Sequence, residues 1–403
     1  MTTDPHPYSA AASATGYLYQ CRYALLEALR RMRHEFDFQV CIETLDDVVF
    51  ERQGAAPDLL QTKHHVSRAA DLTDASVDLW KTLRIWCEGI ANGSLQLGSR
   101  FVLVTTAAAG TGSAAEMLRP GPDRNVAGAL DRLRPTASTS TNQTNGPAYT
   151  AFRALDAATQ KDLFDGVWVV DTASSIASLD SDIRQEVVHA VHHRFLDAFL
   201  VRLEGWWFRR VIRHLAVERG VPILSTELLD EMNNLRESLR EDNLPIDDAI
   251  EQLEVDATGY QERAFVHQLR LIQISNARIV RAIRDYYRAF AQRSLWIREE
   301  LVGIGDLERY ERRLTDAWQS RFLIMRDELG ESAAEDEMRR LACQLYKWVE
   351  TEELPHIRPR CHGGFVARGS FHILADDLKV GWHPEFEARL RRLLEPVCEE
   401  VQQ

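Results

Sequence analysis

Apolar residues near the start of the chain recur every three or four positions, which is the spacing of one face of an α-helix. The pattern is carried by Leu18, Cys21, Leu25, Leu29 and Met32. We therefore expect a first helix from about residue 15 to residue 34. Short runs rich in Val, Ile, Phe and Leu follow, separated by Gly, Pro and Asp, and they predict strands over residues 38–42, 47–50 and 59–64.

A second helix and two more strands extend this first region. The apolar spacing predicts a helix that begins at Thr73 or Asp74, both of which are good N-cap residues. Residues 100–106 (RFVLVTT) and 164–171 (FDGVWVVD) are apolar enough to form buried strands. The order of helix, three strands, helix and strand is typical of an α/β sheet with crossover connections.

The rest of the chain divides into a polar stretch and a helical half. Residues 107–148 are rich in Ala, Gly, Ser, Thr, Pro and Asn, so we expect a flexible surface loop there. From about residue 186 onward the apolar spacing is almost entirely helical. A chain of 403 residues exceeds what one core usually organises. We predict an α/β domain over residues 1–190 and a mostly α-helical domain over residues 191–403.

The net charge of −13 argues against non-specific nucleic-acid binding by the chain as a whole, because phosphate neutralisation needs clustered Lys and Arg. One basic segment exists. Residues 263–298 contain eight arginines and a single acid, Asp285. Charge runs are usually solvated, and we expect this Arg-rich helix to serve a subunit interface or an intramolecular contact rather than DNA. The preceding segment, which is strongly acidic, is a candidate partner for it.

Two absences narrow the function class. No apolar run of 18 residues and no secretory leader are present, so we expect a soluble, cytoplasmic protein without a membrane contact. No GxxxxGK[ST] motif occurs either. Any ATPase function must therefore reside on a partner.

The stretch IETLDDVVFERQGAAPDLLQTKHH carries the most informative chemistry. Side chains of a strand alternate between faces, so Gln61 and Lys63 point the same way. Asp47 begins the preceding strand and can face them across the hairpin. Phosphodiester hydrolysis uses a hard divalent cation held by oxygen ligands, and Mg²⁺ or Mn²⁺ is the cofactor we expect. Asp47 would supply a carboxylate ligand and Gln61 an amide oxygen.

Lys63 would orient or activate the attacking water and stabilise charge on the scissile phosphate, which suits a point charge with three donors. Further acids are candidates to complete the site: Glu43 and Asp46 at the same strand entry, and Glu27 on the first helix. In isolation a Gln-x-Lys pair is weak evidence, because an exposed edge strand often carries Lys. We expect His64 to be packed or at the surface, and His65 to contact phosphate at most.

These residues carry a family resemblance. The pattern of Asp47 followed by Gln61-x-Lys63 resembles the active-site signature of PD-(D/E)xK nucleases in the variant where Gln replaces the second acid. The surrounding text is similar to the double-stranded-DNA endonuclease domain of CBASS-type and Lamassu-type antiphage systems. It comprises ATGYLYQCRYALLEAL, IETLDDVVFE, LLQTKHH, DLTDASVDLWKTLRIW and VLVTT. The resemblance covers residues 13 to about 175 and implies a restriction-endonuclease-like fold and cleavage of double-stranded DNA.

The C-terminal half resembles the C-terminal domain of effectors in ABC-three-component defence systems. The resemblance is carried by EGWWFRRVIRHL, LPIDD, GSFHILADD and VGWHPEFEARL. Together the halves resemble the nuclease subunit of a Lamassu system. That implies an SMC-like ATPase partner, a small bridging subunit, and a nuclease restrained until it is released or assembled into a homo-oligomer. Two rivals stay open: a non-catalytic adaptor that binds DNA or proteins, and a nuclease that cleaves RNA.

Overall fold

The computed structural model describes residues 11–64, 71–216, 221–330 and 333–394. The chain divides into two compact units, Met1–Asn234 and Leu235–Gln403. The boundary lies well beyond the predicted division after residue 190. Two contacts explain the difference: Trp207 donates from its indole to the carbonyl of Cys21 over 2.8 Å, and the strand Ile223–Leu224 pairs with the sheet of the first unit.

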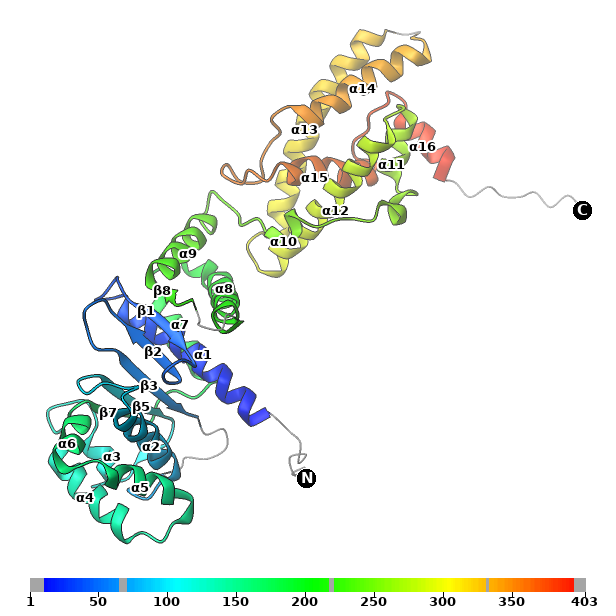
Figure 1. Cartoon of the computed structure of the whole chain (residues 1–403). Helices are drawn as coiled ribbons and strands as arrows, with labels where there is room; N and C mark the ends of the chain where they lie inside the picture. Colours follow the sequence, from blue (N-terminus) through cyan, green and yellow to red (C-terminus); the bar gives the residue numbers. More distant parts are fainter. Residues whose placement is uncertain (1–10, 65–70, 217–220, 331–332, 395–403) are drawn as a thin grey trace, which may run out of the picture. The chain divides into compact units, whose positions relative to one another are not determined.

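The first unit is a mixed α/β structure (Figure 1). Its strands are β1 (Gln39–Ile42), β2 (Val48–Glu51), β3 (Asp58–Lys63), β4 (Asp71–Leu72), β5 (Arg100–Thr105), β6 (Ala108–Ala109), β7 (Val167–Val170) and β8 (Ile223–Leu224). Its helices are α1 (Ala11–Arg31), α2 (Val77–Asn92), α3 (Ala114–Met117), α4 (Val126–Thr139), α5 (Gly146–Ala154), α6 (Ala157–Asp165), α7 (Leu179–Val187) and α8 (Leu196–Ala216), with 3-10 turns η1 (Gln143–Asn145) and η2 (His193–Phe195). The boundary between the units falls within α9 (Ser225–Ser238). The helix and strands predicted over the first hundred residues are confirmed with shifts of a few positions at their ends.

Six of these strands form one sheet in the order β7-β5-β3-β2-β1-β8. β1, β2 and β3 are antiparallel neighbours, whereas β3, β5 and β7 run parallel. β3 is therefore the junction between the two halves of the sheet. β5 is buried from Phe101 to Thr105, as expected for a parallel strand covered on both faces.

Alternation along β3 assigns its side chains to two faces. Leu59 lies in one apolar cluster with residues of α2, α4, α5 and α6, and Gln61 and Lys63 follow it on the same face. Asp58, Leu60 and Thr62 take the opposite face. On that side Arg31 of α1 lies 2.7 Å from the Asp58 carboxylate. The register aligns Lys63 with Thr105 at the carboxyl ends of β3 and β5.

The prediction of a flexible loop over residues 107–148 is wrong, because α3, α4 and η1 occupy much of it. The residues that suggested a loop act as helix caps. Ser113 accepts a hydrogen bond from the amide of Glu116, and Asn125 accepts one from Gly128. In α4, which follows the Asn125 cap, Leu130 and Leu133 pack into the apolar cluster beneath the sheet. Tertiary burial and capping outweigh the loop-like composition.

The second unit is helical, which confirms the prediction for the C-terminal part of the chain. It contains α10 (Asp248–Glu251), η3 (Ala257–Tyr260), α11 (Ala264–Leu271), α12 (Asn276–Arg298), α13 (Ile304–Leu329), α14 (Glu335–Thr351), α15 (Gly364–Asp376) and α16 (Phe386–Leu394). The Arg-rich segment is thus two helices, α11 and α12, separated by a turn. Among the described residues, no helix combines the length and apolar character of a membrane span.

The arginines of α12 make intramolecular contacts. Arg278 donates to Glu350 of α14 over 3.1 Å, and Arg293 pairs with Glu311 of α13. The one acid of this segment, Asp285, also forms an ion pair, with Arg368 of α15 at 2.6 Å. The segment 263–298 therefore helps to hold the second unit together, in line with the intramolecular role considered above. The ion pairs of Arg278 and Arg293 are thus with helices that follow the segment. Its contact with the preceding acidic segment is to backbone, because Arg288 donates to the carbonyl of Leu253 over 2.8 Å.

Helices α12 and α15 approach most closely at Gly369. A Cβ atom at this position would lie 2.0 Å from the carbonyl oxygen of Asp285 and 2.5 Å from the Cβ of Ala289. Because the first obstacle is backbone, the two helices would have to separate to admit a methyl group. Overpacking of this kind costs about 1–3 kcal/mol.

We expect Gly369→Ala to lower the free energy of unfolding of the second unit by about 2 kcal/mol, despite the better helix propensity of Ala. Urea denaturation of the full chain measures this. Gly305→Ala on α13 is the matched control, because the Cβ there would meet nothing closer than an Arg309 nitrogen at 3.7 Å. Equal midpoints for the Gly369 variant and wild type would contradict the close helix contact.

Candidate functional site

The predicted site residues begin in the turn between β1 and β2. Glu43 has a φ of 54°, in the left-handed region that non-glycine residues rarely adopt. Its amide donates to the carbonyl of Asp47 over 3.0 Å, which closes the turn. Such a conformation costs on the order of 1 kcal/mol. The turn therefore keeps a carboxylate where glycine would fit the backbone better.

Asp46 and Asp47 leave this turn and meet β3. The Gln61 side-chain nitrogen donates to a carboxylate oxygen of each, at 2.7 Å for Asp47. The second oxygen of Asp47 accepts from the backbone amide of Thr62 at 2.8 Å and from its hydroxyl at 3.1 Å. On the other side of the amide, the Lys63 ammonium donates to Gln61 Oε1 over 2.9 Å. The structure thus places Asp46, Asp47, Gln61 and Lys63 in one hydrogen-bonded group.

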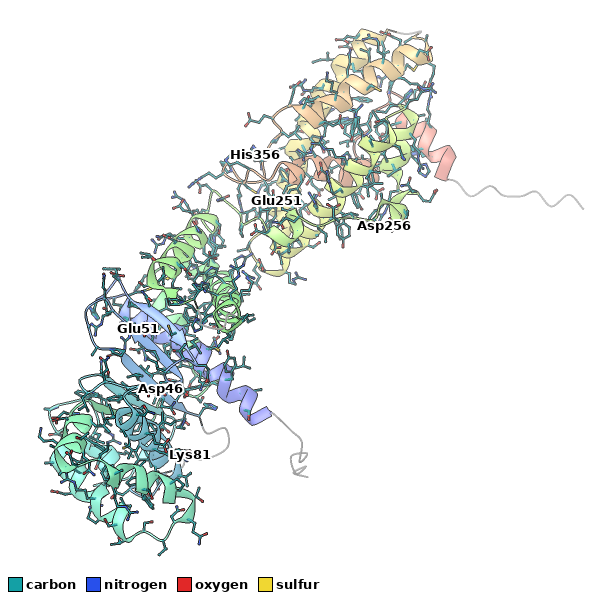
Figure 2. The ribbon with its side chains drawn as sticks, in the orientation of Figure 1. Asp46, Glu51, Lys81, Glu251, Asp256 and His356 are labelled. Carbon is teal, nitrogen blue, oxygen red and sulfur yellow. The ribbon has the colours of Figure 1, made fainter. Side chains whose placement is uncertain are left out.

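Asp46, labelled in Figure 2, is a buried carboxylate of the group, with 7% of its surface exposed. Its Oδ2 accepts from the indole nitrogen of Trp86 over 2.9 Å, and its Oδ1 accepts from the Asp47 amide over 3.0 Å. Burial raises the pKa of Asp46 to about 6, although the hydrogen bonds from Trp86 and Gln61 oppose the shift. With both oxygens occupied, Asp46 is placed to orient its neighbours.

Glu43 lies at the edge of the same group. Burial and the charge of Asp47 raise the pKa of its carboxyl, while a hydrogen bond with Gln20 of α1 and the charge of Lys63 lower it. The Oε1 atom of Gln20 is buried and has no hydrogen-bond donor among the described residues. One acceptor oxygen at the edge of the group therefore lacks a donor, and a bound cation would satisfy it.

Glu27 is the candidate that the structure does not bring to the site. It accepts from Arg31 at 3.1 Å, and Arg31 also pairs with Asp58 at 2.7 Å. Asp58 begins β3, whereas Lys63 ends it, and the two side chains lie on opposite faces. Glu27 therefore belongs to an ion-pair group on the α1 face of the sheet.

The histidines at the end of β3 were weak candidates. The Nε2 atom of His64 accepts from the backbone amide of Ile176 over 3.1 Å, and its ring lies 4.7 Å from that of Tyr19. This confirms a packed role for His64. His65, considered as a phosphate contact, lies outside the described residues.

The sequence alone missed Trp86, Gln20 and Thr62 as neighbours of the site. The indole contact between Trp86 and Asp46 joins α2 to the β1–β2 turn, so it needs the tertiary fold. The hydrogen bond between Gln20 and Glu43 likewise joins α1 to the β1–β2 turn. Only Thr62 had a local signal, since it lies between Gln61 and Lys63.

The donor set fits a hard cation that retains water ligands. Asp47, Glu43 and the amide oxygens of Gln61 and Gln20 are the oxygens that Mg²⁺ prefers. Within the described part of the chain, however, no three His, Cys, Asp or Glu side chains gather closely enough to hold a metal. Binding would thus depend on amide oxygens and water beside the carboxylates. It would also require the Gln61 amide to turn, because its nitrogen now faces Asp47.

One comparison with known proteins gives a result for the C-terminal part. Residues 265–390 match C-terminal domain 7 of the ABC-three component (ABC-3C) systems. The match runs from α11 into α16 and thus spans the helical core of the second unit. The second unit therefore contains a C-terminal domain of the kind found in ABC-three component systems, which confirms this part of the resemblance. The curated proteins contain no match to the chain.

The raised pKa of Asp46 makes stability depend on pH in the cation-free protein. Between the ordinary value of 3.8 and about 6, the folded chain binds more protons than the unfolded chain. The free energy of unfolding therefore gains from Asp46 as pH falls through this window, by about 3 kcal/mol in total. We expect wild type to gain most of that amount, about 2.4 kcal/mol, relative to Asp46→Asn between neutral pH and pH 4. Urea denaturation in EDTA tests this, and a constant difference would contradict it.

Proposed function

We propose that the first unit is an Mg²⁺- or Mn²⁺-dependent endonuclease of the PD-(D/E)xK type that hydrolyses double-stranded DNA. The observation that carries the proposal is the convergence of Asp47, Gln61 and Lys63 at one end of β3, with their polar atoms within 2.9 Å of a neighbour in the group. Polar residues on an exposed edge strand would be solvated and would not be expected to converge in this way. β3 is moreover an inner strand of its sheet.

The element order supports the proposal. A helix, a three-stranded antiparallel stretch, a second helix and a parallel strand occur in the order that the resemblance implies. The acids lie at the start of β2 and Gln-x-Lys lies at the end of β3, so both reach the same edge. A small change in the register of either strand would separate them.

Each side chain has a role in the proposed reaction. A bound Mg²⁺ ion would lower the pKa of a water and neutralise charge on the phosphate. Asp47, and Gln61 after its amide has turned, would hold the cation, with Glu43 as a further carboxylate. Lys63, released from Gln61 Oε1 by that turn, would donate to the attacking water or to the scissile phosphate.

We also propose that the chain is the nuclease effector of a Lamassu-type antiphage complex. The ABC-three component domain supports the existence of partner subunits. The proposed partners are an SMC-like ATPase and a small bridging subunit that the second unit docks. The chain itself lacks a P-loop sequence and carries a net charge of −13. A homo-oligomer would assemble the DNA-binding groove that one acidic chain lacks.

A non-catalytic adaptor is the rival, and two observations favour it. No three-residue group of metal-binding His, Cys, Asp or Glu is found among the described residues, and the Gln61 nitrogen faces Asp47. An adaptor would bind DNA or protein without a cation and would tolerate changes at Lys63. Cleavage of RNA uses the same chemistry, so an RNA substrate is a further arm of the test.

We expect Lys63→Ala to reduce Mg²⁺-dependent cleavage of plasmid DNA at least a hundredfold, because the charge beside the phosphate is lost. Lys81→Ala is the matched control: Lys81 is an exposed lysine on α2, labelled in Figure 2, and takes no part in the hydrogen-bonded group described above. The assay compares Mg²⁺ with EDTA, with and without the partner proteins. Wild-type activity in the Lys63 variant would refute the assignment.

Gln61→Glu tests the cation site without reference to cleavage. A carboxylate in place of the amide adds a charged oxygen ligand beside Asp47, so we expect Mn²⁺ to bind about tenfold more tightly, which corresponds to about 1.4 kcal/mol. Titration calorimetry with MnCl₂ measures the affinity. Gln53→Glu, in the exposed β2–β3 turn, adds the same charge away from the site. Equal affinities for both variants would contradict a ligand role for Gln61.

A further inference from the structure

Two tryptophans of α2 are completely buried and differ in what their indole nitrogens bind. Trp80 donates to the backbone carbonyl of Asp74 over 2.7 Å. Trp86 instead donates to the carboxylate of Asp46 over 2.9 Å. A buried indole needs an acceptor, and either partner satisfies that need. Only the bond from Trp86 reaches the candidate site.

The bond from Trp86 determines how Asp46 is presented to its other neighbours. With Oδ2 held by the indole, Oδ1 is left to accept from the Asp47 amide and from the Gln61 side chain. A carboxylate has little freedom to rotate when one of its oxygens is held by the rigid indole ring of a helix residue. The position of Asp46 Oδ1 therefore follows from the position of α2.

The orientation of the Gln61 amide follows in turn. Its nitrogen faces the carboxylates and its oxygen faces the Lys63 ammonium, so every contact joins a donor to an acceptor. In the reversed orientation the oxygen would face two carboxylates and the nitrogen would face the ammonium group. Both contacts would then be repulsive, and one orientation is strongly favoured.

We propose that Trp86 is a positioning residue that, through Asp46, sets the orientation of the Gln61 amide and thereby the place of the Lys63 ammonium. The inference rests on the proposed nuclease function for its catalytic meaning. The chain of contacts from α2 to Lys63 exists in the cation-free protein, however, and is testable there. Phe in place of Trp86 would keep an aromatic ring against Phe101, whose centroid lies 5.4 Å away, and would remove the donor together with part of the ring volume, as Trp80→Phe also does.

The experiment compares Trp86→Phe with Trp80→Phe in the full-length chain. Both variants lose one indole hydrogen bond from the same buried helix, so their losses of stability serve as a mutual control. The first readout is the rate at which a limiting acetylating reagent modifies Lys63 in EDTA, relative to Lys81 in the same molecule. We expect this ratio to rise at least threefold in Trp86→Phe and to stay at the wild-type value in Trp80→Phe.

Mn²⁺ affinity and plasmid cleavage provide the second and third readouts. Because cation binding requires the Gln61 amide to leave the orientation that Trp86 favours, we expect Trp86→Phe to bind Mn²⁺ several-fold more tightly. We expect the same variant to lose at least tenfold in kcat with KM for DNA unchanged, since Asp46 no longer fixes the Gln61 side chain, and Trp80→Phe to match wild type in all three values. Equal Lys63 modification ratios in the two variants would overturn the positioning role. A raised ratio in Trp86→Phe, together with a wild type that neither binds Mn²⁺ nor cleaves, would retain the positioning role and reject the nuclease.

Discussion

A carboxylate removed from water must be surrounded by donors, and Asp46 is the place where the first unit meets that requirement. Its donors come from α2, from β3 and from the turn that enters β2. Each of these elements must therefore hold its position for the others to be satisfied. The hydrogen bonds to Asp46 therefore hold α2, β3 and the β1–β2 turn together, and the proposed chemistry of Asp47 and Lys63 depends on them.

Much of this arrangement was accessible from the sequence. The alternation in LLQTK assigned Gln61 and Lys63 to one face, and the acids before β2 predicted the pairing with Asp47. These are local signals, since a strand repeats every two residues and a hairpin joins its neighbours. The helical character of the second half followed from the same kind of periodicity.

What the sequence could not provide depended on contacts between distant segments. The role of Trp86 requires α2 to lie over β3. Glu27 was predicted to lie near the site, but Arg31 holds it in an ion-pair group with Asp58 on the other face of the sheet. Residues 107–148 looked like a loop because their Ser and Asn cap helices as readily as they form turns. The orientation of the Gln61 amide depends on charges contributed by three elements, which no local pattern encodes.

Because side chains of a strand alternate between faces, the group of polar residues exists only if the number of residues added to or removed from β3 is even. The turn over residues 52–57 can absorb an added residue, because β2 keeps its pairing with β1 and β3 keeps its alignment with β5. One residue added within β3 would leave an equally apolar strand but would exchange its faces, sending Gln61 and Lys63 toward α1 and Arg31. Insertions and deletions in related chains should thus occur in the turn. A chain with an odd number of residues inserted in or deleted from β3 would retain the fold without the site.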